Sequence, residues 1–155
     1  MQRDLKSVLD GAIGGVLATT LMSTGMWVAY RAGLLGGPPP EIITAAALDA
    51  AGVDERNEGT QDALSVIAHF GFGAVGGALF AVLHRRLRLP IPPVLHGAIY
   101  ATGVWAVSYI GVVPALGIMP TPTRDRRDRH AVMLLVHWVY GATLGAYVRG
   151  TERHQ

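Results

Sequence analysis

The sequence lacks cysteine, and its 155 residues include few charged and few aromatic side chains. The absence of thiols excludes a disulfide-stapled scaffold, thiolate metal sites, iron–sulfur clusters and cysteine nucleophiles. Charged residues make up 15% of the chain, whereas a soluble domain has about 25%. The formal net charge is only +2, so we do not expect nucleic acid as a partner.

Motifs for catalysis are also missing from the sequence. It contains no Gly-rich phosphate loop, no His-Glu-x-x-His and no nucleophile elbow. Apart from Asp10 at the edge of the first apolar run, no carboxylate lies inside the apolar runs to complete a metal shell. We therefore predict no catalytic residue, no metal site and no enzymatic activity.

Apolar residues are what the chain has in excess, since half of it is hydrophobic and the mean hydropathy is +0.34. They gather in four runs of 19 to 25 residues, at about residues 8–32, 63–83, 94–118 and 130–148. About 20 helical residues cross the ~30 Å hydrocarbon core of a bilayer. The runs predict an all-α integral membrane four-helix bundle, with residues 1–155 as a single membrane domain.

The long link between the first two runs carries its own helical pattern. Prolines at 38–40 stop the first helix and suit the first turn of another, where Glu41 matches the positive end of the helix dipole. Apolar residues then recur at helical spacing as far as Ala50. We predict a short amphipathic helix at about residues 39–51 that lies in the membrane interface. A loop helix packed on the bundle is the alternative.

Charge favours one orientation of the four spans. With an even number of spans, both termini lie on the same side, which carries seven basic and three acidic side chains. The other side carries six basic and eight acidic side chains, so the formal charges are +4 and −2. The positive-inside rule then predicts a multi-pass protein of the bacterial inner membrane with both termini in the cytoplasm.

A local pattern occurs in both the second and the fourth run. Residues 69–78 and 137–146 are identical at five of ten positions, beginning with His69 and His137. The pattern indicates duplication of a two-helix hairpin. It also contains two glycine stripes of the kind that let transmembrane helices approach closely, at Gly73, Gly77, Gly141 and Gly145. A groove for a lipid or a cofactor is the alternative use of these stripes.

The two histidines in this pattern are the candidate functional residues. His69 and His137 each lie about six residues inside a span, and an ionisable residue there is a functional-site hypothesis by default. Three interpretations stay open: neutral imidazoles that bond to neighbouring helices, ligands of haem, a metal or a pigment, and carriers or sensors of protons. The cofactor is unknown. His84 receives no role, and His96 is expected at the membrane interface.

A resemblance to known proteins rests on two segments, Gly11-Ala12-Ile13-Gly14-Gly15 through Met22-Ser23 and the ending from His137 to Gly145. These resemble the YagU-like inner-membrane proteins and related bacterial families of unknown function. The resemblance implies a small helical inner-membrane protein with a loose association to acid tolerance, and it supplies no catalytic residues.

Three functions fit these observations. The first is a non-enzymatic membrane protein with membrane lipid around it, either self-assembling as a homo-oligomer or an accessory subunit of a larger membrane complex. The second is a small transporter or proton-linked channel that uses His69 and His137. The third is a haem- or pigment-binding electron-transfer subunit.

Overall fold

The computed structural model describes residues 2–37, 39–53, 57–120 and 127–152, and every regular element in these ranges is helical. Three long helices are α1 (Gln2–Arg31), α3 (Glu58–Leu87) and α6 (Arg127–Glu152). A fourth is continuous from α4 (Pro93–Trp105) through η1 (Ala106–Val112) to α5 (Val113–Ala115). The short helix α2 (Pro39–Ala50) lies in the first link. The all-α prediction is confirmed for the described residues.

Four of these helices are long and apolar enough to cross a membrane: Asp4–Arg31, Glu58–Leu87, Pro93–Ala115 and Arg127–Thr151. Three of them extend past the predicted apolar runs. The 30 residues of α3 measure about 45 Å at 1.5 Å per residue, more than the ~30 Å hydrocarbon core. Helix α3 is therefore long enough to cross this core with residues to spare at its ends.

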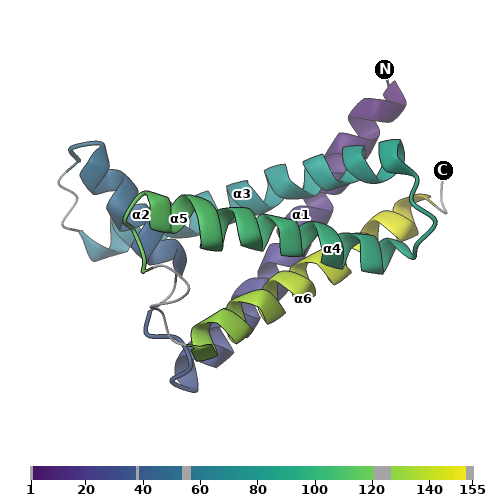
Figure 1. Ribbon diagram of the computed structural model, residues 1–155. Coiled ribbons are helices and arrows are strands. Elements are labelled where there is room, and N and C mark those ends of the chain that lie inside the picture. Colours follow the sequence, from purple (N-terminus) through teal and green to yellow (C-terminus); the bar gives the residue numbers. More distant parts are fainter. Residues whose placement is uncertain (1, 38, 54–56, 121–126, 153–155) are drawn as a thin grey trace.

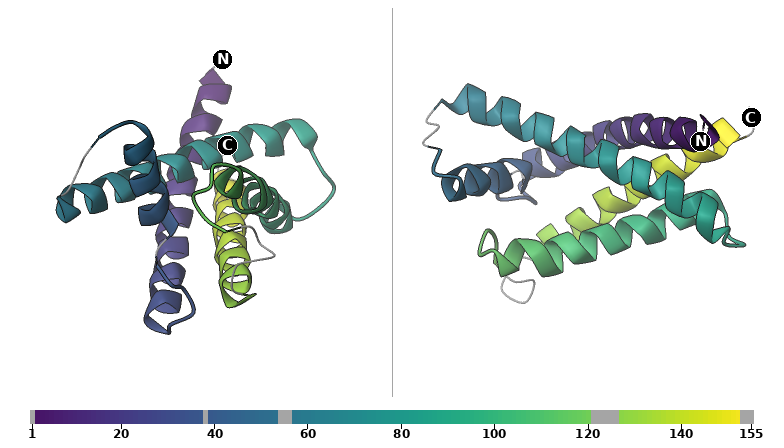
Figure 2. Two further views of the ribbon diagram at one scale, coloured as in Figure 1. Left: turned by 60° about the vertical axis from the view of Figure 1, so that its left-hand side comes forward. Right: turned by 90° about the horizontal axis from the view of Figure 1, so that it is seen from above.

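Helices α1 and α6 rise beside each other from the lower part of Figure 1, and α3 and α4 run across the view. Helix α1 packs on both α3 and α6, and α4 packs on α6, whereas α3 and α4 make few backbone contacts. Helix α3 lies across α1 at an open angle (Figure 2). The regular four-helix bundle stays a prediction, because the described helices cross in pairs.

Side chains fill the space between the two pairs of helices. Phe80, Leu144 and Thr19 are the largest side chains that are fully buried. Two tyrosines also donate hydrogen bonds to α3: the Tyr100 hydroxyl to the carbonyl oxygen of Gly76, and the Tyr140 hydroxyl to that of Gly73, each over 2.8 Å. These bonds join α4 and α6 to α3, although their backbones stay apart.

The third span contains a wide helical segment with a local cause. Pro114 has no N–H to give to a carbonyl one turn earlier, and its ring crowds that carbonyl in a regular α-helix. In η1 the hydrogen bonds reach back five residues, so the Val113 N–H bonds to the Ser108 carbonyl. The helix ends at Ala115, earlier than the predicted residue 118, because Gly117 adopts φ +71° and closes a C-terminal turn.

Candidate functional site

The glycines of α3 sit where α3 crosses α1. A Cβ built on Gly73 would meet the Thr19 side chain, and one built on Gly77 would meet the carbonyl oxygen of Gly11. A Cβ on Gly15 would in turn meet the carbonyl oxygen of Gly73. The two backbones therefore touch at Gly15 and Gly77, and the Thr19 side chain fills the space at Gly73.

The glycines of α6 meet α4 in the same way. A Cβ on Gly141 would meet the carbonyl oxygen of Gly97, and one on Gly145 would meet that of Pro93. The two helix pairs thus share a pattern. Two glycines four residues apart, on α3 or on α6, face two backbone carbonyls four residues apart, on α1 or on α4.

His69 lines a cleft between α1, α2 and α3, with a volume of about 290 Å³. Its Nε2 atom is buried and has no hydrogen-bond partner among the described residues. The cleft is lined by Ser23, Met26, Trp27, Tyr30, Pro40, Glu41, Ser65, Val66, His69 and Phe70. Met26 and Ser65 are buried at its floor, while Glu41 is exposed at its rim. The cleft thus combines apolar walls with a few polar groups.

Negative charge dominates the rim of this cleft. Partial burial, reinforced by the neighbouring carboxylate of Asp62, raises the pKa of Glu41 above its usual range. The Arg31 guanidinium stacks over the ring of Trp27, a residue of the cleft lining, with 5.6 Å between Cζ and the ring centroid. Glu41 is therefore the charged group that lines this cleft, and the Asp62 carboxylate lies near enough to act on it.

His137 is placed differently from His69. Its Nδ1 donates a hydrogen bond to the Met133 carbonyl of its own helix over 2.7 Å, which fixes the Nδ1–H tautomer. The imidazoles of His69 and His137 are close enough to interact electrostatically. The structure thus brings the two predicted residues to one region, but only His69 lines the cleft described above.

A second histidine pair joins the end of α3 to the start of α4. The Nδ1 atoms of His84 and His96 lie 2.7 Å apart, so one donates and the other accepts. Phe80 contacts both rings, with centroid distances of 5.5 and 5.3 Å. The sequence predicts no role for His84 and a position at the membrane interface for His96. The available signal was the short Pro-rich link, which returns the chain on itself and brings its two ends together.

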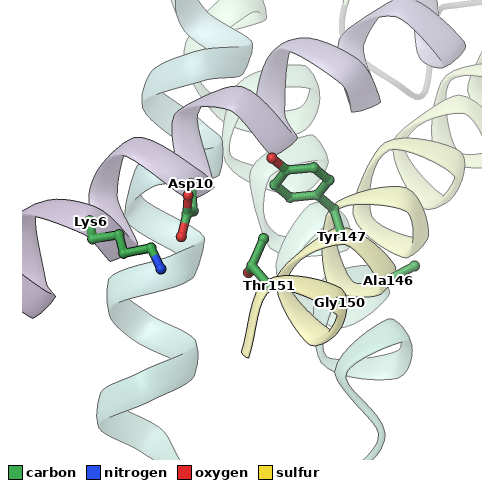
Figure 3. Close-up of a pocket in the computed structure, with 6 residues that line it drawn as sticks. All are labelled: Lys6, Asp10, Ala146, Tyr147, Gly150 and Thr151. Atoms are coloured by element: carbon green, nitrogen blue, oxygen red, sulfur yellow. The ribbon is translucent and has the colours of Figure 1, made fainter. Parts of the chain in front are cut away.

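A further cleft lies between the first turns of α1 and the last turns of α6, with a volume of about 360 Å³ (Figure 3). Lys6 and Asp10 project from α1 toward Thr151. Opposite charges side by side give this cleft little net potential, and neither candidate histidine lines it.

Fold and site together define a small all-helical protein of the membrane. The chain belongs to a family of unknown function, DUF6789, whose model matches residues 5–155. No curated protein and no solved structure gives a significant match. The comparisons link the chain to a family of unknown function but not to the YagU-like proteins. The segments that suggested them consist largely of Gly and Ala, which recur in many packed transmembrane helices.

Proposed function

We propose that this chain is a non-enzymatic integral membrane protein that assembles with a second copy of itself through the outward face of α4. The observation that carries the proposal is the exposure of this span. Only 17% of its apolar window is buried, against 22% for α3, 39% for α1 and 44% for α6. A span that packs along one helix and touches α3 mainly near its start has most of its surface available for another helix or for lipid.

The outward face of α4 has the composition of a helix contact. Leu95 and Ile99 of α4 are 48% and 54% exposed, and Val107, where the same face continues into η1, is 66% exposed. They follow one another at steps of four with Gly103 between Ile99 and Val107, and a Cβ on Gly103 would meet nothing within 4 Å. Small residues between large apolar ones allow a second helix to approach closely in lipid, where apolar burial gives no driving force.

The absence of cysteine makes the test direct. Val107→Cys should give a disulfide-linked dimer when membranes are oxidised. Val75→Cys is the matched control, because Val75 is 69% exposed but lies on α3. Equal cross-linking of the two variants, or none with Val107→Cys, contradicts self-assembly through α4. A native mass that contains one copy together with a different chain indicates the accessory subunit instead.

We further propose that the protein lies in the bacterial inner membrane with both termini in the cytoplasm, and that it arose by duplication of a helical hairpin. The charge difference of +4 against −2 supports the orientation. The equivalent glycine contacts of α1 with α3 and of α4 with α6 support the duplication. Helices α3 and α6 would then be the repeated second members, related by an axis normal to the membrane.

Proton-linked transport is the second candidate function, favoured by the buried and unpartnered Nε2 of His69. The test is proton flux into proteoliposomes, followed with a trapped pH dye. His69→Gln should abolish the flux and His137→Gln should preserve it, because only His69 lines the open cleft. No flux from the unaltered protein excludes this candidate. A haem- or pigment-binding subunit would instead show a visible absorption band that both variants weaken.

A further inference from the structure

The cleft between α1, α2 and α3 is the most ligand-like feature among the described residues. It combines an apolar floor and walls, at Met26 and Phe70, with polar groups from all three helices. Small-molecule sites have this character, with few polar groups set in apolar surroundings. The polar groups decide which ligand class fits.

The acceptors in the cleft outnumber its fixed donors. The Glu41 carboxylate accepts hydrogen bonds only, and the hydroxyls of Ser23 and Ser65 can accept as well. No lysine or arginine lines the cleft. A primary ammonium has three N–H donors and no acceptor, so its chemistry complements this set.

Charge selects the same class. Glu41 stands at the rim, and Asp62 is near enough to affect its ionisation. Arg31 supplies the opposing positive charge, but its guanidinium is engaged with the Trp27 ring. The Glu41 carboxylate attracts a cation that enters past it and repels a phosphate or carboxylate, and the lining beyond it is largely apolar.

We propose that this cleft binds a primary ammonium group carried on an apolar or aromatic body, with Glu41 as its counter-ion. Two sources have this chemistry: the ethanolamine headgroup of a phospholipid and a free amphiphilic amine. The inference goes beyond both proposed functions and depends on neither.

The first test measures binding of 2-phenylethylamine to the full chain in nanodiscs of phosphatidylcholine, which has no primary amine. Titration calorimetry should give saturable binding. The uncharged analogue 2-phenylethanol should bind about tenfold more weakly, the size of one charge-assisted hydrogen bond. Equal binding of amine and alcohol, or no saturable binding of the amine, overturns the proposal.

Variants locate the site. Glu41→Gln keeps the shape and removes the charge, so it should weaken amine binding about tenfold and leave alcohol binding unchanged. Asp49→Asn is the matched control, because Asp49 is an exposed acid of the same helix that does not line the cleft. Equal effects of the two substitutions would show non-specific attraction and would refute the site. Unchanged circular dichroism and thermal unfolding of both variants exclude misfolding as the cause.

Nanodiscs that contain phosphatidylethanolamine separate the two sources. If the lipid headgroup is the ligand, it competes and the apparent affinity for 2-phenylethylamine falls in these discs but not when Glu41 is replaced. If a free amine is the ligand, the affinity is the same in both discs. If phosphatidylethanolamine lowers the affinity for 2-phenylethylamine in Glu41→Gln as well, the lipid and the amine compete at another site. That result contradicts the assignment of Glu41 as the counter-ion.

Discussion

Gly141→Ala is the most direct perturbation of the helix contacts, because the added methyl group would meet backbone atoms. Its Cβ would lie 2.6 Å from the carbonyl carbon of Gly97 and 2.7 Å from the Cβ of Ala101. Backbone cannot rotate away as a side chain does, so α4 and α6 must separate. Overpacking of this kind costs about 1–3 kcal/mol, and the better helix propensity of alanine returns about 0.5–1 kcal/mol. We expect a net loss of about 1–2 kcal/mol in the free energy of unfolding.

The control is Gly71→Ala on α3, where a Cβ would meet nothing within 4 Å. That variant should gain about 0.5–1 kcal/mol from helix propensity alone. The assay is equilibrium unfolding in mixed micelles with increasing dodecyl sulfate, followed by tryptophan fluorescence. If both substitutions shift the midpoint in the same direction and by the same amount, the close approach of α4 and α6 is not a feature of the protein in solution.

Three further predictions concern other parts of the structure. Tyr140→Phe removes the hydroxyl bonded to Gly73 and should cost about 0.5–1.5 kcal/mol, while Tyr30→Phe, at an exposed tyrosine, should cost nothing measurable in the same unfolding assay. Because the folded protein raises the pKa of Glu41 above its ordinary 4.5, the contribution of this group to stability is complete below that pH and is lost as pH rises through the folded value. The free energy of unfolding should therefore fall between pH 4 and pH 7 in the unaltered protein, and this fall should be absent in Glu41→Gln. If Glu41→Gln shows a fall of the same size, a group other than Glu41 causes it. A cytoplasm-only fluorescent reporter after Gln155 should be bright, and activity of a periplasm-only phosphatase fused there reverses the topology.

The helices were predictable from the sequence, because four apolar runs of the right length have few structural alternatives. Their ends were not. Helix α3 begins at Glu58 with Asn57 as its cap, five residues before the predicted span, since the Asn57 side chain accepts a hydrogen bond from the Thr60 N–H. Hydropathy registers the membrane core, whereas local capping chemistry determines where a helix begins.

The pairing of the helices was less accessible. The glycine stripes at Gly73 and Gly141 indicated close contacts, but periodicity does not name the partner helix. The partner helices α1 and α4 contribute the backbone carbonyls of Gly11, Gly97 and Pro93 to these contacts. Every residue has a backbone carbonyl, so the sequence does not mark which ones make a contact. The tyrosine bonds to α3 were equally hidden, because each depends on where a neighbouring backbone lies.

The candidate site was predicted in part. His69 was recognised because an ionisable group inside an apolar run is rare, but the cleft around it requires α2 to fold back onto α3. Helix α2 itself begins at the predicted Pro39 and ends at Ala50, one residue earlier than predicted. Its position beside His69 depends on the turn after α1, which sequence spacing alone does not determine.

The wide segment η1 also bears on how related sequences align with this one. A helical turn whose hydrogen bonds reach back five residues contains one residue more than a regular α-helical turn. Deleting one residue from η1 therefore restores a regular turn, and the residues before and after it keep facing the same neighbours. The same deletion in α4 would rotate everything beyond it by about 100°. A regular helix does not accommodate a proline at position 114. A relative that lacks one residue of η1 should therefore also have a residue other than proline at this position. Relatives with a third span one residue shorter should therefore carry the gap within 106–112 and lack the proline.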